Sequence, residues 1–349
     1  MRSINGTKRK KPTKKIKMGD ADWVKVKGDA ELNGMTVTVD KNSGLVVKIS
    51  TRKCLDANRW LSMPSLEEHR SLKKLELDKS RYLKELDPSV CSLVLLDTLI
   101  LTRCTSLTCL PNDIGRLQNL KKLDLTDASE ISSLPDSIGD LISLSKLTIG
   151  GQIGSGNKKL ITLPESLGKL KNLEVLDLSK CKELTCLPQS IGNLSNLYSL
   201  QMRECKAVKE LPSSIGNLKK LVDVSLSKCM GLTSLPPSIG GWESVEDLNL
   251  NKCKGLKELP DSLCDLKTLC MLDLRACKFL KNLPRAIGNL TNLKFLDLRN
   301  CKRLETLPPS LGQLTKLVLL DVSDCVDLVI PTSLEIFKDM AIGFDDKME

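Results

Sequence analysis

The chain has 349 residues, 14 cysteines, an aromatic content of only 3% and a formal net charge of +10 at pH 7. Residues 1–20 alone carry eight basic side chains against one acidic side chain, so only +3 remains for the rest of the chain. The nearly neutral rest of the chain argues against a nucleic-acid-binding surface there. The sequence also contains no run of 18 apolar residues, the length that a membrane-spanning helix needs. We expect an intracellular protein, cytoplasmic or nuclear, because no apolar signal segment follows the basic start and so many cysteines suit a reducing compartment.

The first segment, residues 1–20, is highly charged and almost free of apolar side chains, so we expect it to be disordered. Its clustered basic residues are Lys8, Arg9, Lys10, Lys11, Lys14 and Lys15. Such a cluster is typical of a nuclear-localisation signal or of a segment that binds polyanions. Contact with an anionic membrane and a simple solubility tail are the alternatives.

Residues 21–71 form an irregular N-terminal cap in this interpretation. Two runs rich in β-branched residues, 35–39 and 45–49, flank a turn sequence that ends in Gly44, which predicts a β-hairpin. We expect Trp23 and Trp60 to pack in the cap. A cap is needed because the first coil of a solenoid would otherwise expose its apolar end.

Nine Leu-Pro steps follow, and their prolines recur every 24 positions except across one longer gap, from Pro135 to Pro164. The prolines are Pro111, Pro135, Pro164, Pro188, Pro212, Pro236, Pro260, Pro284 and Pro308. A period of 20 to 29 residues with regularly placed leucines is typical of a solenoid of leucine-rich repeats. The longer gap contains residues 150–159, which we expect to form a surface bulge.

One repeat shows how each coil should fold. Leu176 and Leu178 alternate with polar Asp177, the pattern of a half-buried strand. Pro188 cannot donate to a sheet ladder, so the chain leaves the sheet there, and we expect Gly192 to let the backbone turn. The strand pairs of the eleven predicted coils are Leu75/Leu77, Leu99/Leu101, Leu123/Leu125, Leu147/Ile149, Leu176/Leu178, Leu200/Met202, Val224/Leu226, Leu248/Leu250, Leu272/Leu274, Leu296/Leu298 and Leu320/Val322.

The predicted fold is therefore an α/β solenoid, a curved horseshoe with a parallel concave sheet of about eleven short strands. Its convex side should be made of loops or short helices. We assign residues 72–331 to the solenoid and residues 332–349 to a C-terminal cap with an acidic tail, because Ser333 to Met340 has helical apolar spacing after a serine cap.

A cysteine stands three positions after the second strand residue in most coils. The residues at this position are Ser80, Cys104, Ala128, Gln152, Cys181, Cys205, Cys229, Cys253, Cys277, Cys301 and Cys325. Metal sites need close cysteine pairs, whereas these thiols recur only once in each coil. We therefore expect small buried side chains that bond the turn backbone of their own or the next coil, and no metal site.

The stretch from Leu173 to Asn196 resembles the leucine-rich repeat regions of plant nucleotide-binding disease-resistance proteins and of intracellular scaffold proteins of the Ras pathway. The resemblance covers about residues 72–331. It implies either a scaffold that binds proteins or a regulatory module that acts on a separate signalling enzyme or nucleotide switch, in a Ras-type pathway or in defence signalling. No nucleotide-binding switch domain is recognisable in this chain.

The concave columns of the last three coils suggest a protein-binding site. An apolar column is accompanied by acidic and arginine columns, a combination that is typical of binding hot spots. The candidate residues are Met271, Asp273, Arg275, Phe295, Asp297, Arg299, Leu319 and Asp321. Phe295 and Leu319 could instead pack under the C-terminal cap while the charged residues form a solvated ladder.

No pattern supports catalysis or a cofactor. His69 is the only histidine, and we expect it to pack rather than catalyse. Gly151 and Gly156 have the spacing of a phosphate-binding loop, but Asn157 stands where that motif requires lysine. We expect a monomeric, non-enzymatic protein without cofactor whose solenoid binds protein partners and not nucleic acid.

Overall fold

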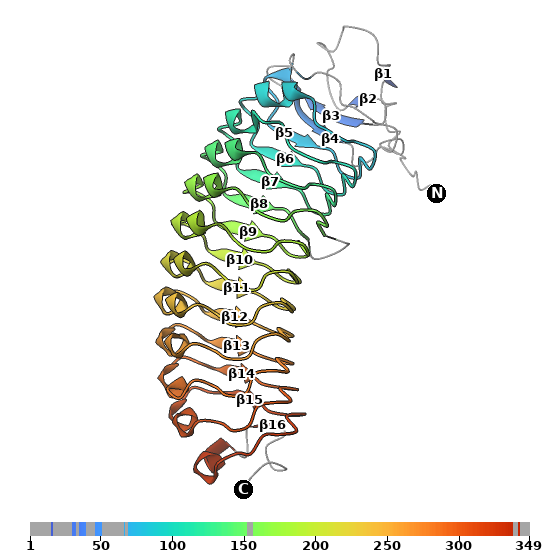
Figure 1. Cartoon of the computed structure of the whole chain (residues 1–349). Coiled ribbons are helices and arrows are strands. Elements are labelled where there is room, and N and C mark those ends of the chain that lie inside the picture. Colours follow the sequence, from blue (N-terminus) through green and yellow to red (C-terminus); the bar gives the residue numbers. More distant parts are fainter. Residues whose placement is uncertain are drawn as a thin grey trace, which may run out of the picture.

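A computed structural model describes residues 15–16, 30–32, 35–39, 46–50, 66, 69–151, 156–337 and 341–342. It shows a curved solenoid in which one sheet runs the length of the chain and the 3-10 turns line one side (Figure 1). The strands are hydrogen-bonded in chain order from β1 to β16. The predicted solenoid is thus confirmed, with a short strand in each of the eleven coils.

The first strands are β1 (Lys15–Ile16), β2 (Ala30–Leu32), β3 (Met35–Val39) and β4 (Val46–Ser50). The repeat strands are β5 (Lys74–Glu76), β6 (Thr98–Ile100), β7 (Lys122–Asp124), β8 (Lys146–Thr148), β9 (Val175–Asp177), β10 (Ser199–Gln201), β11 (Asp223–Ser225), β12 (Asp247–Asn249), β13 (Met271–Asp273), β14 (Phe295–Asp297) and β15 (Leu319–Asp321), and β16 (Ala341–Ile342) follows. The 3-10 turns are η3 (Pro88–Ser92), η4 (Ile114–Arg116), η5 (Asp136–Asp140), η6 (Glu165–Lys169), η7 (Gln189–Asn193), η8 (Ser213–Asn217), η9 (Pro237–Gly241), η10 (Asp261–Asp265), η11 (Ile287–Asn289), η12 (Pro309–Gln313) and η13 (Thr332–Phe337).

The start of the sheet differs from its body. β3 pairs antiparallel with β2 and with β4, in the region where the sequence predicts a hairpin. β4 then pairs parallel with β5, so this ribbon continues directly into the repeats. The chain segments that contain Trp23 and Trp60 lie outside the described residues.

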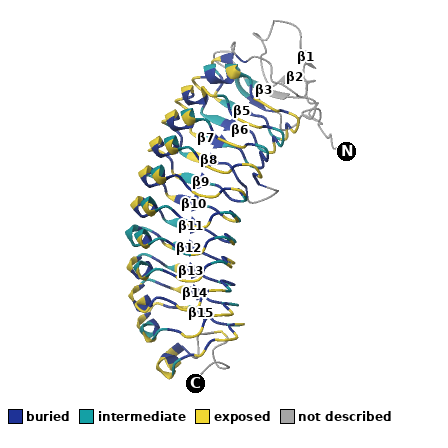
Figure 2. Ribbon diagram, in the orientation of Figure 1, coloured by how far each residue is buried: buried dark blue, intermediate teal, exposed yellow. Residues whose placement is uncertain are grey.

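The leucines of the repeats form one continuous core. Both apolar residues of the predicted strand pair are at most 1% exposed in every coil, while the turns at the periphery carry many exposed residues (Figure 2). Each coil covers the apolar side of its neighbour, which is why stacking stabilises coils that could not fold alone. At the C-terminal end, η13 buries Leu334 and Phe337 against the last coil.

The turn after each strand ties three coils together. The residue before the cysteine position is left-handed in the described repeats, with φ of 58–63° at ten non-glycine residues. In coil ten, for example, the N–H of Asn300 donates to the carbonyl of Ser323 in the next coil, and the thiol of Cys301 donates to Leu274 of the preceding coil. The side chain therefore bonds the coil before it, whereas we expected its own coil or the next one.

The fourth coil corrects another prediction. Gln152 lies outside the described residues, and the cysteine position of this coil is held by Asn157, which is fully buried. Its Nδ2 donates to the carbonyls of Ala128 and Ile131, at 3.0 and 2.9 Å, and its Oδ1 accepts from two backbone N–H groups. Gly156, with φ of 68°, takes the left-handed place before it. The extra residues of this coil therefore lie before this position, because Asn157 stands one regular repeat ahead of Cys181.

The repeated glycine of the 3-10 turns has a different role from the one we predicted. Gly192 lies within η7 without the positive φ that a glycine turn would need. A Cβ on Gly192 would instead lie 2.3 Å from the carbonyl oxygen of Ser214 in the next coil. Glycine is required here because neighbouring backbones approach too closely for any side chain.

Replacing Gly192 by Ala should therefore lower the free energy of unfolding by about 1–3 kcal/mol through overpacking. Gly312→Ala is the matched control, because its Cβ would meet only side-chain atoms, the nearest at 3.6 Å. Denaturant unfolding of both variants checks the prediction. Equal stability of the two variants would show that backbone approach is not the reason for glycine.

Glu76 is a buried carboxylate held by two lysines at the junction of β4 and β5. It is 3% exposed, and its oxygens lie 2.6 Å from Lys74 Nζ and 3.2 Å from Lys48 Nζ. Burial alone would raise the pKa of Glu76, but hydrogen bonds from Lys74, Ser50 and Lys48 outweigh it and lower the pKa from 4.5 to about 2. The ionised form therefore stabilises the native state.

Because the folded pKa lies below the unfolded one, this stabilisation is present above pH 4.5 and is lost as the pH falls toward 2. Glu76→Gln should thus destabilise the protein most near pH 7, by up to roughly 3 kcal/mol at about 1.4 kcal/mol per pKa unit. The difference from wild type should shrink as the pH falls below 4.5. Thermal unfolding across this range tests the prediction, with the exposed Glu210→Gln as control; a difference that does not change with pH would contradict it.

Candidate protein-binding face

An apolar ridge runs across the last three repeat strands. Met271 pairs with Phe295, and Phe295 pairs with Leu319, in the parallel register of β13, β14 and β15. Neighbouring positions in such a register are about 4.8 Å apart. Met271 is 40% exposed, Phe295 is 37% exposed and Leu319 is half-buried. The structure thus brings the three predicted apolar residues together on the surface.

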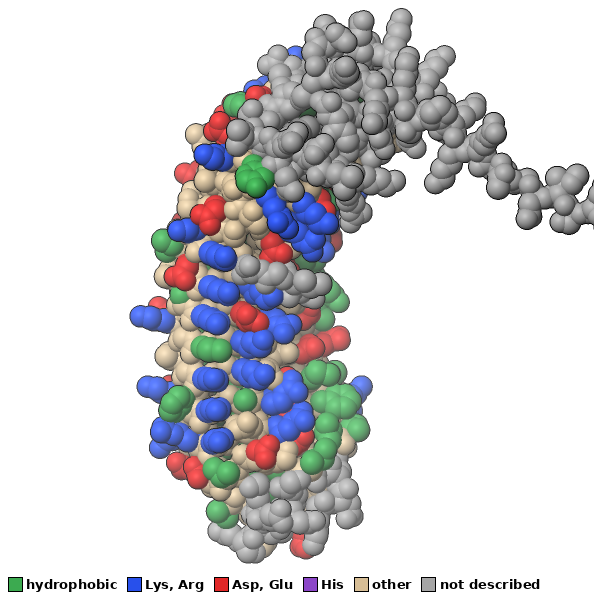
Figure 3. Space-filling model, turned by 90° about the vertical axis from the view of Figure 1, so that its right-hand side faces the viewer, with side chains coloured by type: hydrophobic (Ala, Val, Ile, Leu, Met, Phe, Trp, Pro, Cys, Tyr) green, Lys and Arg blue, Asp and Glu red, His purple; other side chains and the backbone are tan. Residues whose placement is uncertain are grey.

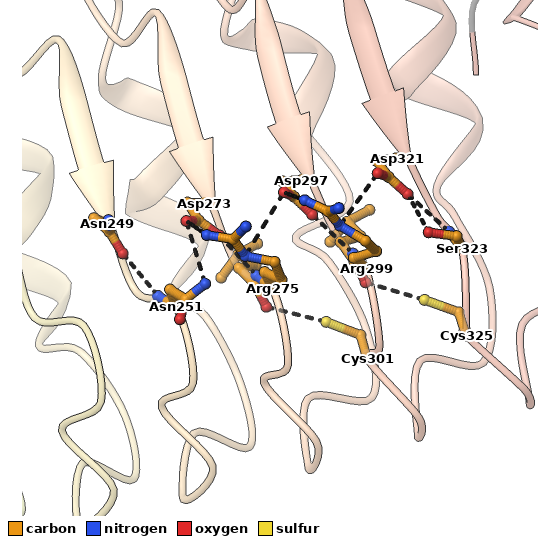
Figure 4. Close-up of polar contacts among 12 residues, drawn as sticks. Asn249, Asn251, Asp273, Arg275, Asp297, Arg299, Cys301, Asp321, Ser323 and Cys325 are labelled. Carbon is orange, nitrogen blue, oxygen red and sulfur yellow. Dashed lines mark hydrogen bonds and ion pairs between the residues drawn. The ribbon is translucent and has the colours of Figure 1, made fainter. Parts of the chain in front are cut away.

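The charged candidates form a ladder along the ends of β13, β14 and β15 (Figure 4). Arg275 Nη2 lies 3.0 Å from Asp273 Oδ2, and its Nε lies 3.9 Å from Asp297 Oδ2. Arg299 repeats the arrangement one coil later, with Nη2 2.8 Å from Asp297 and Nε 3.2 Å from Asp321. Each arginine therefore joins its own coil to the next, and the acidic column does not form a separate cation site.

The second oxygen of each aspartate holds the turn. Oδ1 of Asp273 accepts from the backbone N–H of Arg275 at 3.0 Å, and Asp297 and Asp321 make the same bond two residues on. Burial raises the pKa of Asp273, opposed by its bonds from Arg275, and the hydrogen bond with Asp297 raises the pKa of Arg299. The aspartate oxygens thus already bond groups of the protein itself, whereas both arginine side chains remain 41% exposed. The arginines are the groups that can contact a partner.

Sequence reasoning missed an exposed aromatic residue on the neighbouring flank. Phe279 is 43% exposed, with the Arg303 guanidinium 4.6 Å from the centre of its ring. Both residues border an open hollow of about 740 Å³ together with Lys281 and Arg285. The prediction considered only the positions within and directly after the strands. Phe279 lies two residues after Cys277, so a comparison of that position across the repeats would have found it.

The cysteine column consists of buried thiols that bond the backbone. All eight column thiols are free and buried, and seven donate to the carbonyl of the residue 27 positions earlier: Cys104, Cys205, Cys229, Cys253, Cys277, Cys301 and Cys325. Burial raises the pKa of Cys104 and of Cys301 to about 12. Within the described residues, no group of three or more His, Cys, Asp or Glu side chains could hold a metal ion.

The remaining predicted site, from Lys8 to Lys15, lies almost wholly outside the described residues, so its role stays a prediction. His69 is 9% exposed, and its carbonyl accepts from the N–H of Leu72. In the part of the chain that the structure describes, no helix has the length and apolar character needed to cross a bilayer.

Comparison with known proteins agrees with this geometry. A family model described as "Leucine-rich repeat region" matches residues 55–185 and 153–231, and a second, "Leucine Rich Repeat", matches residues 292–314. The chain belongs to the leucine-rich repeat family. A search of curated proteins gave no match.

Among solved structures, the leucine-rich repeat domain of the type III effector XopL is 28% identical with a TM-score of 0.54, over 66% of this chain and 76% of that one. An internalin of Listeria monocytogenes is 17% identical with a TM-score of 0.54, over 88% and 89% of the two chains. A TDR receptor is 22% identical with a TM-score of 0.53, over 82% of this chain and 55% of that one. The last two similarities concern the fold alone. Solenoids of this family are typically interaction modules, and no catalytic family matches.

The burial of the column thiols, together with raised pKa values such as those of Cys104 and Cys301, predicts that these thiols resist alkylation in the native protein, because only the thiolate reacts. Iodoacetamide at pH 7.5 should modify the exposed Cys109 and Cys186 first, and the eight column thiols only after denaturation. Peptide mapping by mass spectrometry distinguishes the two classes. Rapid modification of Cys205 or Cys253 in the folded protein would contradict this interpretation.

Proposed function

We propose that the chain is an intracellular scaffold that binds a protein partner through the C-terminal third of its concave face, formed by β13, β14 and β15. The residues that would contact the partner are Met271, Arg275, Phe295, Arg299 and Leu319, and Asp273, Asp297 and Asp321 complete the site by orienting the two arginines. The observation that carries the proposal is the exposed ridge of Met271, Phe295 and Leu319 beside two half-exposed arginines.

The physical argument concerns what such a surface gains on binding. Exposed apolar side chains release water when a partner covers them, and a central aromatic residue beside arginines is typical of hot spots. Arg275 and Arg299 are already oriented by Asp273, Asp297 and Asp321, so little side-chain entropy is lost when they bind a carboxylate. The exposure of Phe295 favours binding over the alternative that it packs under the C-terminal cap.

A regulatory module that acts on a separate signalling enzyme or nucleotide switch is the alternative, favoured by the resemblance of residues 173–196 to such proteins. Isolation of partners with the wild-type chain, followed by mass spectrometry, distinguishes the two functions. One stable GTPase or phosphatase favours regulation, and a varied set of proteins favours the scaffold.

With an isolated partner, Phe295→Ala should weaken binding by about 2 kcal/mol, roughly a 30-fold increase in Kd. The melting temperature should change little, because the core residues Leu296 and Leu298 remain. Tyr198→Ala is the control, since Tyr198 is exposed but lies far from the ridge along the chain. Loss of stability in Phe295→Ala without loss of affinity would refute the proposal.

A further inference from the structure

Lysines form a straight column on the flank that the loops after the strands build. They occupy the position directly after the cysteine column in six coils: Lys158, Lys182, Lys206, Lys254, Lys278 and Lys302. Met230 holds the same position in the coil between Lys206 and Lys254. Figure 3 shows this face, where blue side chains gather in a band along the solenoid. At about 4.8 Å per coil, the column is roughly 29 Å long.

The charges of this column are not balanced within the protein. In the described part of the chain, none of the six column lysines makes an ion pair, and Glu204 pairs instead with Lys228 beside the column. Stacked like charges raise the energy of the free protein, and salt screens them only partly. This differs from the concave face, where aspartates bridge the arginines. An anionic ligand along the column would relieve the repulsion.

The middle of the column is hollowed. Lys206, Met230, Lys254 and Lys278 line an open hollow of about 420 Å³, and Met230 is 37% exposed there. An adjoining hollow shares Lys228 and Lys252 and is otherwise lined by serines, asparagines and two arginines, of which Arg275 belongs to the concave face. The surface therefore offers positive charge on both sides of an apolar contact, with hydrogen-bonding groups alongside.

We propose that this lysine column binds an extended acidic peptide segment of a protein partner, with an apolar side chain of the segment on Met230. An extended chain advances about 3.3 Å per residue and points alternate side chains to one side. About nine residues would span the column, and carboxylates two residues from the apolar one, about 6.6 Å away on the same side of the peptide, would meet Lys206 and Lys254. None of the column residues belongs to the concave site, and the proposal does not depend on that site.

Nucleic acid and membranes fit this surface less well. Single-stranded nucleic acids stack their bases on aromatic side chains, the column contains none, and the neighbouring Phe279 has Arg303 over its ring. A phosphate backbone would also meet Met230 in the middle of its path. A planar anionic membrane would meet the carboxylates of Glu204, within the hollow, and exposed Glu183 beside Lys182.

The test measures binding of a short labelled peptide, with glutamate and serine alternating around a central leucine, by fluorescence anisotropy at low salt. The triple variant Lys206→Gln, Lys254→Gln, Lys278→Gln should raise Kd at least tenfold. The control triple Lys171→Gln, Lys220→Gln, Lys316→Gln removes the same charge at exposed lysines that bond neighbouring coils elsewhere, and should change Kd less than twofold. An equal loss of peptide affinity in the two triple variants would show that only the net charge of the protein matters, and would overturn the proposal.

Two further measurements identify the ligand class. Met230→Ser should raise Kd about threefold for the leucine peptide and leave it unchanged for the same peptide with a central glycine; an equal effect on both peptides would remove the apolar contact from the proposal. An oligothymidine of similar length and vesicles that mix phosphatidylserine with phosphatidylcholine are measured in the same way. If either binds more tightly than the peptide, and the triple variant of the column loses that binding, the column is a nucleic-acid or membrane site. The proposal of a peptide ligand would then be overturned.

Discussion

The turn that follows each strand is the contact on which the solenoid depends. Its left-handed residue donates a backbone N–H to the next coil, and its cysteine or asparagine donates to the coil before. A left-handed conformation is unfavourable for residues such as Lys79 or Glu204, so it persists because the stacked neighbours supply these bonds and bury the strand leucines. Each coil is therefore stable only as a member of the stack.

This stacking converts sequence columns into lines on the surface. Because the repeat strands pair parallel and in register, residues one repeat apart in the chain become neighbours at about 4.8 Å. A residue type that recurs at one position of the repeat therefore forms a continuous line along the surface of the molecule. The apolar ridge, the arginine ladder and the lysine column all arise in this way.

The two basic surfaces differ because of what lies beside them. On the concave face, every arginine of the ladder has an aspartate in its own coil and another in the next. On the loop flank, the left-handed residues two positions before the column lysines are mostly lysine, glycine, alanine or asparagine. The same stacking therefore yields oriented, neutralised charges on one face and uncompensated charge on the other. The two faces are suited to partners of different chemistry.

The sequence by itself determined the solenoid, the eleven strands and the buried leucines, since a regular repeat with alternating leucines can bury its apolar residues only by stacking. It also placed Met271, Phe295 and Leu319 in one column. Only the tertiary structure decided that Asn157 replaces Gln152, because Gln152 lies one regular repeat after Ala128 and Asn157 lies one regular repeat before Cys181, so the spacing fits both. It also showed that Gly192 serves close packing, that each arginine joins two coils and that the loop lysines share one flank. These properties depend on distances between coils, which no single repeat contains.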